Sequence, residues 1–438
     1  RHHDPDLTAR TYVDALWSSG QTVKVRNGSL LANRLADVFE EASPTDREYH
    51  ALETSVASTL QARGTPRLFL DLSEVVHSDY GTGVHRVVRN LARECLLGEQ
   101  ATRFVVHPVA HVADGTMVSA ESFTRDVLGV PDAGRSPISD MRAGDVLFLL
   151  DSAWDKTERF EHSIANTHRA GGRVGAMVYD LIPLRHPQHC VDFMPAVFEQ
   201  WLRYVVLNCD VLVCISRAVA DDLQAWIREV APEQRIGQRI GHVHLGSDLV
   251  EQGAKGEPSR VVRNAFAKPA VLMVGTVEPR KGHGLALDAF ELAWKRGSSM
   301  VLVIIGKKGW NVEALASRLR DHPEAGKRLL WLEKVGDADL EHAYASAVAL
   351  LQASSAEGFG LPIVEAARHG VPLLLSDIPV FREVAREHAA YFTLEGPESL
   401  ARLLVSSLPP AAPVDLGLTW SESASKFMQL LLNGGWDY

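Results

Sequence analysis

The stretch that decides the fold is AVLMVGTVEPRKG, residues 270–282. A short apolar run ends in a glycine, two cations follow at Arg280 and Lys281, and a helical pattern starts near His283. This order predicts a buried strand, a loop and the first turn of a helix, which together form half of a βαβ unit. In open α/β sheets, ligands bind at the carboxyl ends of such strands.

Similar runs on both sides of this stretch form two series, each alternating with amphipathic segments. The first series is RLFLDL (67–72), FVVHPVA (104–110), DVLFLLD (145–151), RVGAMVYD (173–180) and DVLVCIS (210–216). The second series is AVLMVGT (270–276), MVLVIIG (300–306), RLLWLEKV (328–335), VALLQAS (348–354) and VPLLLSD (371–377). We therefore expect an α/β protein with two Rossmann-like domains that face a cleft.

The domain boundaries follow from changes in these patterns. Residues 1–64 are polar with apolar residues at helical spacing, and we expect an accessory helical extension there. We expect residues 65–255 to form the N-terminal domain and residues 268–415 to form the C-terminal domain, after a polar, glycine-containing linker. The segment 416–438 predicts a helix that crosses back to the N-terminal domain. Because the sequence begins with Arg1 and not Met, we expect it to be a piece of a longer polypeptide.

Composition favours small-molecule chemistry. The 438 residues carry a formal net charge of -10, which disfavours a broad electrostatic surface for nucleic acid or for anionic membranes. No apolar run approaches the roughly 20 residues of a membrane-spanning helix. The sequence predicts a cytoplasmic protein, with association at the inner face of the membrane or with another domain left open.

The four cysteines show no CxxC pairing, which argues against a disulfide framework and a structural zinc site. His186, His189 and Cys190 are close in sequence, but a fourth ligand at useful spacing is missing. We therefore expect no metal site and no cofactor.

The Arg280-Lys281 pair matches the charge of a diphosphate at the end of a strand and beside a helix N-terminus. A solvated pair on a surface turn is the alternative interpretation.

A second motif, EGFGLPIVEA, follows the strand at 348–354 and spans residues 357–366. Its glycines allow close approach of the backbone, and Pro362 suits the first turn of a helix. Glu357 is placed to accept hydrogen bonds from sugar hydroxyls, and Glu365 from the two hydroxyls of a ribose. The alternative is that both acids are ordinary partners of the helix dipole and that Phe359 belongs to the core.

Together, VGTVEPRKG and EGFGLPIVE resemble the motifs of the retaining, metal-independent GT-B glycosyltransferases of group 1, which include bacterial mannosyltransferases of polysaccharide assembly. The resemblance covers about residues 67–432 and implies that the domain at 65–255 is on the acceptor side and that the domain at 268–415 binds the nucleotide sugar. It implies that Arg280 and Lys281 bind the donor diphosphate, that Glu357 contacts the donor sugar, and that Glu365 holds the ribose.

Further donor contacts follow from the same resemblance. The family contributes backbone groups from the glycine turn, here Gly358, Phe359 and Gly360, and places the nucleotide base near the loop that contains Val335. Many relatives carry another arginine where this chain has Thr276, so phosphate binding depends on the two remaining cations.

Two N-terminal segments also resemble these mannosyltransferases. In DYGTGVHRVVR (79–89), Gly81 and Gly83 would let the backbone approach the donor phosphate or the acceptor; a tight turn with an exposed basic helix face is the alternative. In YDLIPLRHP (179–187), relatives have a histidine at the position of Tyr179, and its phenol can only hydrogen-bond a sugar hydroxyl near neutral pH. Asp180 is the stronger catalytic candidate of the two. Ser216 is expected to cap a helix.

The implied activity is transfer of a sugar with retention of anomeric configuration, catalysed by Lys281, Arg280, Glu357 and Asp180. The relatives favour GDP-mannose as donor and a glycan or lipid-linked glycan of bacterial polysaccharide, such as O-antigen, as acceptor. Two alternatives stay open: another donor, such as a UDP- or dTDP-sugar (rhamnose, for example), and a catalytically weak scaffold domain within a larger assembly enzyme.

Overall fold

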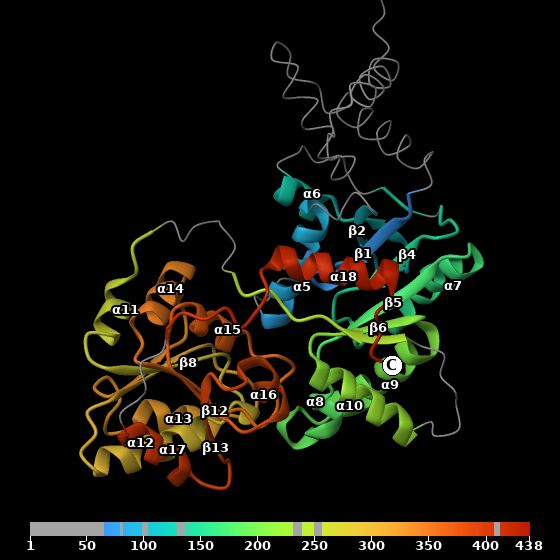
Figure 1. Cartoon of the computed structure of the whole chain (residues 1–438). Helices are drawn as coiled ribbons and strands as arrows, with labels where there is room; N and C mark the ends of the chain where they lie inside the picture. The colour runs from blue at the N-terminus through green and yellow to red at the C-terminus, as the bar shows by residue number, and fades with distance from the viewer. Residues whose placement is uncertain are drawn as a thin grey trace, which may run out of the picture.

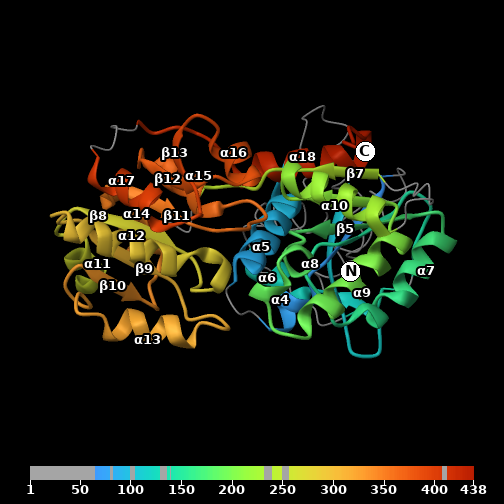
Figure 2. The same ribbon diagram turned by 90° about the horizontal axis from the view of Figure 1, so that it is seen from below.

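The computed structural model describes residues 65–78, 82–98, 104–128, 136–138, 140–230, 239–248, 256–406 and 412–438. These residues form two α/β domains (Figure 1), which lie side by side in the perpendicular view of Figure 2. The expected helical extension, residues 1–64, lies outside the described residues.

The N-terminal domain is built on a seven-stranded sheet in the order β3-β2-β1-β4-β5-β6-β7. All neighbours are parallel except the β2–β3 pair at one edge. The strands are β1 (Arg67–Asp71), β2 (Val105–His111), β3 (Met117–Ser119), β4 (Val146–Leu149), β5 (Arg173–Val178), β6 (Val211–Cys214) and β7 (Arg239–His242). The helices are α4 (Ser73–His77), α5 (Gly83–Leu97), α6 (Glu121–Leu128), α7 (Glu161–Arg169), α8 (Ile182–Arg185), α9 (Met194–Asn208) and α10 (Arg217–Val230), with 3₁₀ turns η2 (Thr157–Arg159) and η3 (Pro187–His189).

The C-terminal domain has a six-stranded parallel sheet in the order β10-β9-β8-β11-β12-β13. The strands are β8 (Ala270–Val274), β9 (Val301–Ile305), β10 (Leu329–Leu332), β11 (Ala349–Gln352), β12 (Leu373–Ser376) and β13 (Ala389–Phe392). The helices are α11 (Arg260–Ala265), α12 (His283–Lys295), α13 (Glu313–Asp321), α14 (Asp337–Ser346), α15 (Leu361–Arg368), α16 (Pro379–Ala385) and α17 (Pro397–Val405), with one 3₁₀ turn, η4 (Pro279–Lys281).

Both sheets are doubly wound, so the predicted fold class of two Rossmann-like domains is confirmed. Each predicted apolar run forms a strand, because a strand covered by helices on both faces is buried along its length. The sequence prediction missed β3, β7 and β13, which are edge strands of three or four residues.

The last helix, α18 (Trp420–Asn433), follows the C-terminal domain in sequence but packs against α5 of the N-terminal domain. Figure 1 shows it lying across the N-terminal domain, far from α17, the helix that directly precedes it in the chain. The Phe427 ring meets the edge of the Phe148 ring of β4 at a centroid distance of 4.7 Å. The N-terminal core is therefore completed by the far end of the chain.

Candidate functional site

The candidate site begins at the centre of the C-terminal sheet, where β8 lies between β9 and β11. The direction of winding reverses between β8 and β11, so the connections that leave these two strands run to opposite faces of the sheet. The loop after β8 carries Arg280 and Lys281, and the loop after β11 carries Glu357. The two motifs found in the sequence therefore meet at one point of the fold.

Gly282 allows the two loops to approach each other. It has a φ of 70°, and a Cβ added there would lie 2.1 Å from the carbonyl oxygen of Ala353. Only glycine tolerates both this backbone conformation and this contact. The turn η4 therefore holds both cations directly beside the end of β11.

The two cations share one carboxylate. Nζ of Lys281 lies 2.5 Å from Oε1 of Glu357, and Nη1 of Arg280 lies 2.9 Å from Oε2. Arg280 also contacts Glu278, with 3.1 Å between Nε and Oε2, and Ser354 donates a hydrogen bond of 2.7 Å to Glu357. The group of Glu278, Arg280, Lys281 and Glu357, called the ion quartet below, has no formal net charge.

The pKa values of the ion quartet follow from burial and pairing. Burial alone would raise the pKa of Glu357, but Arg280 and Lys281 outweigh burial and lower that pKa to about 2. Burial lowers the pKa of Arg280, but Glu357 and Glu278 more than compensate and raise it above its ordinary value. The pKa of Glu278 is raised, chiefly by burial. Glu357 therefore stays ionised throughout the neutral range.

Asp180 brings a further carboxyl group to the site from the N-terminal domain. Burial raises its pKa, Arg280 opposes this effect, and Glu357 reinforces it. Its Oδ1 accepts a hydrogen bond of 2.9 Å from the backbone N–H of Ile182. The charges of the ion quartet therefore shift the pKa of Asp180, the predicted catalytic residue of the other domain.

The glycine turn lies close against the N-terminal domain. A Cβ on Gly358 would lie 2.2 Å from the carbonyl oxygen of Tyr179, so no larger residue fits without a shift of the backbone. The carbonyl of Gly358 accepts a hydrogen bond of 2.8 Å from Ser216, whose Oγ also accepts one from the backbone N–H of Val219. Ser216 therefore caps α10, as predicted, and also joins the two domains.

The other residues of the glycine turn divide between backbone and core roles. Gly360 has a φ of 103° and directly precedes α15, a conformation that favours glycine. The Phe359 side chain is buried and packs edge-on against the His244 ring at 5.4 Å. Any contact between Phe359 and a donor would therefore come from its backbone.

Glu365 lies in α15 and is buried. Its Oε2 accepts a hydrogen bond of 2.6 Å from the hydroxyl of Tyr344, and its Oε1 lies 2.6 Å from Nη1 of Arg86 in α5 of the other domain. The sequence motif gave the acid but not its partners, because Arg86 is nearly 280 positions away in the chain.

Four further predicted positions lie around this centre or outside the described residues. The Tyr179 hydroxyl is buried and donates to the carbonyl of Leu150 at 2.7 Å, so in this structure it is used within the N-terminal domain and not directed at the donor side. Gly83 opens α5 and is exposed. Val335 is half-buried in the loop before α14, packed against the core. Gly81 lies outside the described residues.

The sequence analysis did not single out Asp151, which follows β4 at the reversal point of the N-terminal sheet. Burial raises its pKa to about 6. Its oxygens accept hydrogen bonds from the backbone N–H groups of Val75 and Ser152, so it holds the start of α4. The signal was present in the sequence, as an acid directly after a buried strand.

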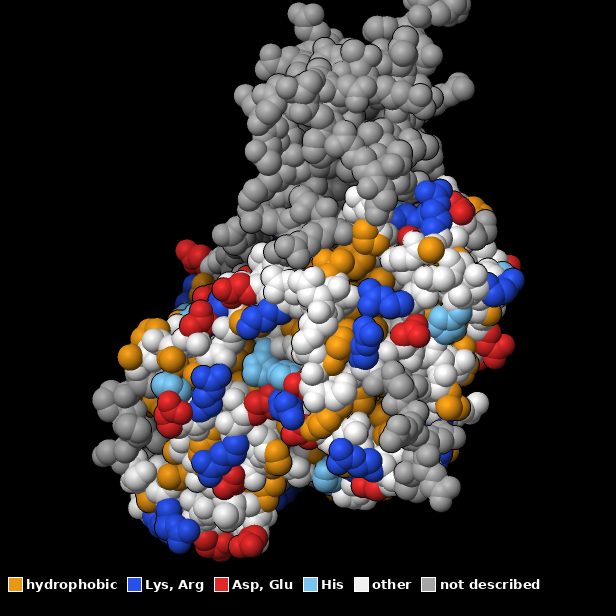
Figure 3. Space-filling view, turned by 45° about the vertical axis from the view of Figure 1, so that its right-hand side comes forward, with side chains coloured by type: hydrophobic (Ala, Val, Ile, Leu, Met, Phe, Trp, Pro, Cys, Tyr) orange, Lys and Arg blue, Asp and Glu red, His pale blue; other side chains and the backbone are white. Residues whose placement is uncertain are grey.

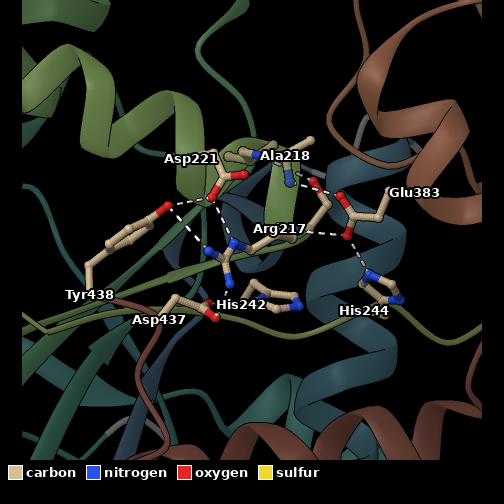
Figure 4. A network of polar contacts seen from close by, with 10 residues as sticks. Arg217, Ala218, Asp221, His242, His244, Glu383, Asp437 and Tyr438 are labelled. Atoms are coloured by element: carbon tan, nitrogen blue, oxygen red, sulfur yellow. Dashed lines mark hydrogen bonds and ion pairs between the residues drawn. The ribbon is translucent and has the colours of Figure 1, made fainter.

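A second network of polar contacts joins the two domains (Figure 4). Glu383 of α16 accepts hydrogen bonds from the backbone N–H groups of Arg217 and Ala218, at 2.8 Å each, and contacts Nε2 of His244 at 2.5 Å. Burial would raise the pKa of Glu383, but these hydrogen bonds lower it. A residue of the C-terminal domain thus caps a helix of the N-terminal domain. Figure 3 shows acidic, basic and histidine side chains close together near the middle of one face.

Within the described residues, one group has the spacing of metal ligands: His242, His244 and Glu383 offer ligand atoms within 4.8 Å of one another. Both Glu383 oxygens already accept hydrogen bonds from α10, and His242 contacts Asp437 at 2.6 Å. This arrangement suits a contact between domains, with each carboxylate already bonded. The His186 and His189 rings stack with their centroids 5.8 Å apart, and the latter's Nε2 lies 3.4 Å from the hydroxyl of Ser355.

The two doubly wound domains and the paired motifs agree with the GT-B architecture expected from the sequence. Residues 259–408 match the family described as Glycosyl transferases group 1. The chain is 32% identical over 440 aligned positions to the serotype-specific mannosyltransferase WbdA of Escherichia coli, covering 97% of this chain and 54% of that protein. It is 34% identical over 237 positions to the O-antigen chain mannosyltransferase RfbU of Salmonella typhimurium, covering 53% and 61%. The chain therefore spans about half the length of the WbdA proteins.

Solved structures share the fold at low sequence identity. The N-terminal domain of trehalose-6-phosphate phosphatase from Candida albicans matches with a TM-score of 0.54 at 14% identity, covering 85% of this chain and 97% of that one. HepE of Anabaena, solved with UDP and glucose, matches with a TM-score of 0.51 at 13% identity, covering 83% and 95%. Among the described residues, no helix is long and apolar enough to span a bilayer.

Proposed function

We propose that this chain transfers mannose from GDP-mannose to a glycan acceptor of bacterial polysaccharide, with retention of anomeric configuration. The observation that carries the proposal is the ion quartet at the reversal point of the C-terminal sheet, within the residues that match the group 1 family. Two cations that each lie within 3 Å of one carboxylate match a sugar diphosphate, which offers an anion and hydroxyl groups side by side.

The roles of the residues follow from their chemistry. Arg280 and Lys281 would bind the diphosphate and stabilise the charge that develops as the glycosidic C–O bond breaks. Glu357, ionised at neutral pH, would then accept hydrogen bonds from the donor sugar, and Asp180 would contact the sugar from the other domain. The acceptor hydroxyl would attack the anomeric carbon on the face from which the diphosphate leaves, and a phosphate oxygen would take its proton. No nucleophile from the protein is required.

The mannose is supported by the names of the relatives, since WbdA and RfbU are both mannosyltransferases. The GDP is taken from the resemblance of the paired motifs to those of bacterial mannosyltransferases. Each pairing of a base with a sugar predicts a different pattern of binding. The donor is tested by thermal unfolding with GDP, UDP and dTDP and with their mannose, glucose and rhamnose conjugates. A ligand held at a hundredfold its dissociation constant stabilises the folded state by about 2.7 kcal/mol.

We expect GDP and GDP-mannose to give the largest shifts, and GDP-mannose to support transfer to a mannose-terminated oligosaccharide. The anomeric configuration of the product, read by NMR coupling constants, tests retention. A larger shift of the unfolding temperature with a UDP- or dTDP-sugar would change the proposed donor but would leave the proposed transferase activity in place. Binding of no nucleotide by the folded protein would contradict the proposal and favour the scaffold alternative.

A further inference from the structure

The contact between Arg86 and Glu365 is an ion pair in the place where the donor ribose would bind. Glu365 is the acid proposed to hold the ribose hydroxyls, yet its Oε1 lies 2.6 Å from the guanidinium of a residue in the other domain. A ribose and Arg86 therefore compete for the same carboxylate oxygen.

The geometry of this contact is that of a replaceable partner. Oε1 of Glu365 is buried, and no hydrogen bond of normal geometry reaches it from any residue that the structure describes, although Arg86 is close enough for an ion pair. Oε2, by contrast, receives a well-formed hydrogen bond from Tyr344. A buried carboxylate oxygen without a hydrogen bond is costly, and a ribose hydroxyl would supply one.

The two side chains also differ in their freedom to move. The Glu365 side chain is 2% exposed, whereas that of Arg86 is 32% exposed and lies in the first turn of α5. The partly exposed guanidinium of Arg86 can turn into water, which hydrates its charge when a ligand takes its place on Glu365. The buried Glu365 side chain cannot reach water in the same way. When a ribose binds, Arg86 is therefore the group that moves, and Glu365 stays in place.

We propose that Arg86 is a specificity residue of the donor site: it neutralises Glu365 across the domain boundary until a ribose diol displaces it. This inference rests on the proposed function, because it requires a nucleotide donor at this site. A ligand with a diphosphate but no ribose hydroxyls leaves the ion pair in place and gains nothing from Glu365. Arg86 thereby sets how much of the binding free energy comes from the ribose.

The test measures dissociation constants by calorimetry for GDP and 2′,3′-dideoxy-GDP, and for the corresponding uridine pair. The quantity of interest is the ratio of the dideoxy constant to the parent constant, because it isolates the ribose hydroxyls while base and diphosphate stay the same. We compare the wild type with Arg86→Gln. The matched control is Arg93→Gln, since Arg93 lies in the same helix, is 31% exposed and contacts Glu94 at 3.7 Å.

Arg86→Gln is expected to raise this ratio roughly three- to tenfold, because the parent nucleotide no longer breaks an ion pair. Binding of the dideoxy nucleotide should stay within about twofold, and Arg93→Gln should behave as the wild type. In the wild type, raising the salt concentration should increase the same ratio, since screening weakens the partly exposed pair and both ligands carry the same diphosphate. This measurement needs no variant and stands even if Arg86→Gln does not fold.

An unchanged ratio in Arg86→Gln and at high salt would overturn the inference, as would equal weakening of both nucleotides, which would place Arg86 against another part of the donor. Failure of all four nucleotides to bind the wild type would instead overturn the proposed function.

Discussion

Nζ of Lys281 lies 2.5 Å from Oε1 of Glu357. In the proposed reaction, this ammonium group lies where the departing diphosphate develops negative charge. Replacing Lys281 with alanine removes a contact that is strongest in the transition state, so turnover should fall about 100-fold. The Michaelis constant for the acceptor should stay within about threefold, because Lys281 lies in the donor-side domain. Steady-state kinetics with the acceptor varied give both values.

The control for this variant is Lys308→Ala, which removes a lysine that follows the neighbouring strand β9 and pairs with Glu313 at 3.0 Å. It should leave turnover within about twofold. Unchanged turnover in a folded Lys281→Ala protein would remove this residue from the chemistry.

The stability that the ion quartet contributes depends on pH through Glu357. Its pKa falls from the usual 4.5 to about 2 on folding, so its ionised form stabilises the folded state. That contribution is fully present above pH 4.5 and is lost as the pH falls toward 2. Glu357→Gln should therefore be less stable than the wild type from pH 8 to pH 5, and the difference should narrow below pH 4.5. Urea unfolding of both proteins across this range tests the sign.

A difference in stability that stayed constant down to pH 3 would show that Glu357 acts through packing and not through its charge.

The ion quartet also shows how much of a site can be predicted from sequence at the scale of single residues. The motifs identified Arg280, Lys281 and Glu357, because each follows a strand that the apolar pattern predicts. They did not show that these residues pair with one another, since no local pattern reports a contact between side chains about 75 positions apart.

At the scale of secondary structure, α10 has an N-terminus that is capped from two domains. Ser216 accepts from the backbone N–H of Val219, and Glu383 accepts from the N–H groups of the two residues that follow Ser216. Glu383→Gln keeps the shape but leaves one accepting oxygen in place of two. The free energy of unfolding should fall by about 1 kcal/mol, the usual range for loss of a helix cap.

Amide hydrogen exchange should show the loss in the first turn of α10, although the substitution lies in α16. Glu387→Gln is the control, because Glu387 is close in sequence and its side chain is 80% exposed. Loss of protection confined to α16 would contradict the capping role.

Most strands could be predicted from the sequence of the strand itself. The strands that could not be predicted share a physical cause, because all of them lie at the edge of a sheet. The central strands are rich in large apolar residues because both faces are covered, whereas β7 reads Arg-Ile-Gly-His and β13 begins with two small alanines. An edge strand has one neighbour and more solvent, so its sequence need not be a run of large apolar residues. The Ser216 cap was predictable because a cap is a local feature, whereas the second cap from Glu383 depends on how the domains meet.

At the scale of the whole molecule, α18 belongs to one domain by sequence and to the other by packing. Phe427 is fully buried against Phe148, so Phe427→Ala should lower the free energy of unfolding by about 3–5 kcal/mol. Hydrogen exchange should rise in β4 and β5 and stay unchanged in β8 and β11. The control is Gln429→Ala, an exposed position on the same helix. Increased exchange confined to the C-terminal domain would contradict this assignment of α18.

The same helix affects how the protein is made. Strands β1 to β6 leave the ribosome before α18, so the Phe427 contact to Phe148 cannot form until α18 has been synthesised. The C-terminal sheet ends at Phe392 and can close before that point. Domains usually fold in the order in which they emerge. Here the N-terminal domain emerges before the C-terminal domain but is completed after it, and until then the nascent chain carries an open hydrophobic surface that chaperones would have to protect.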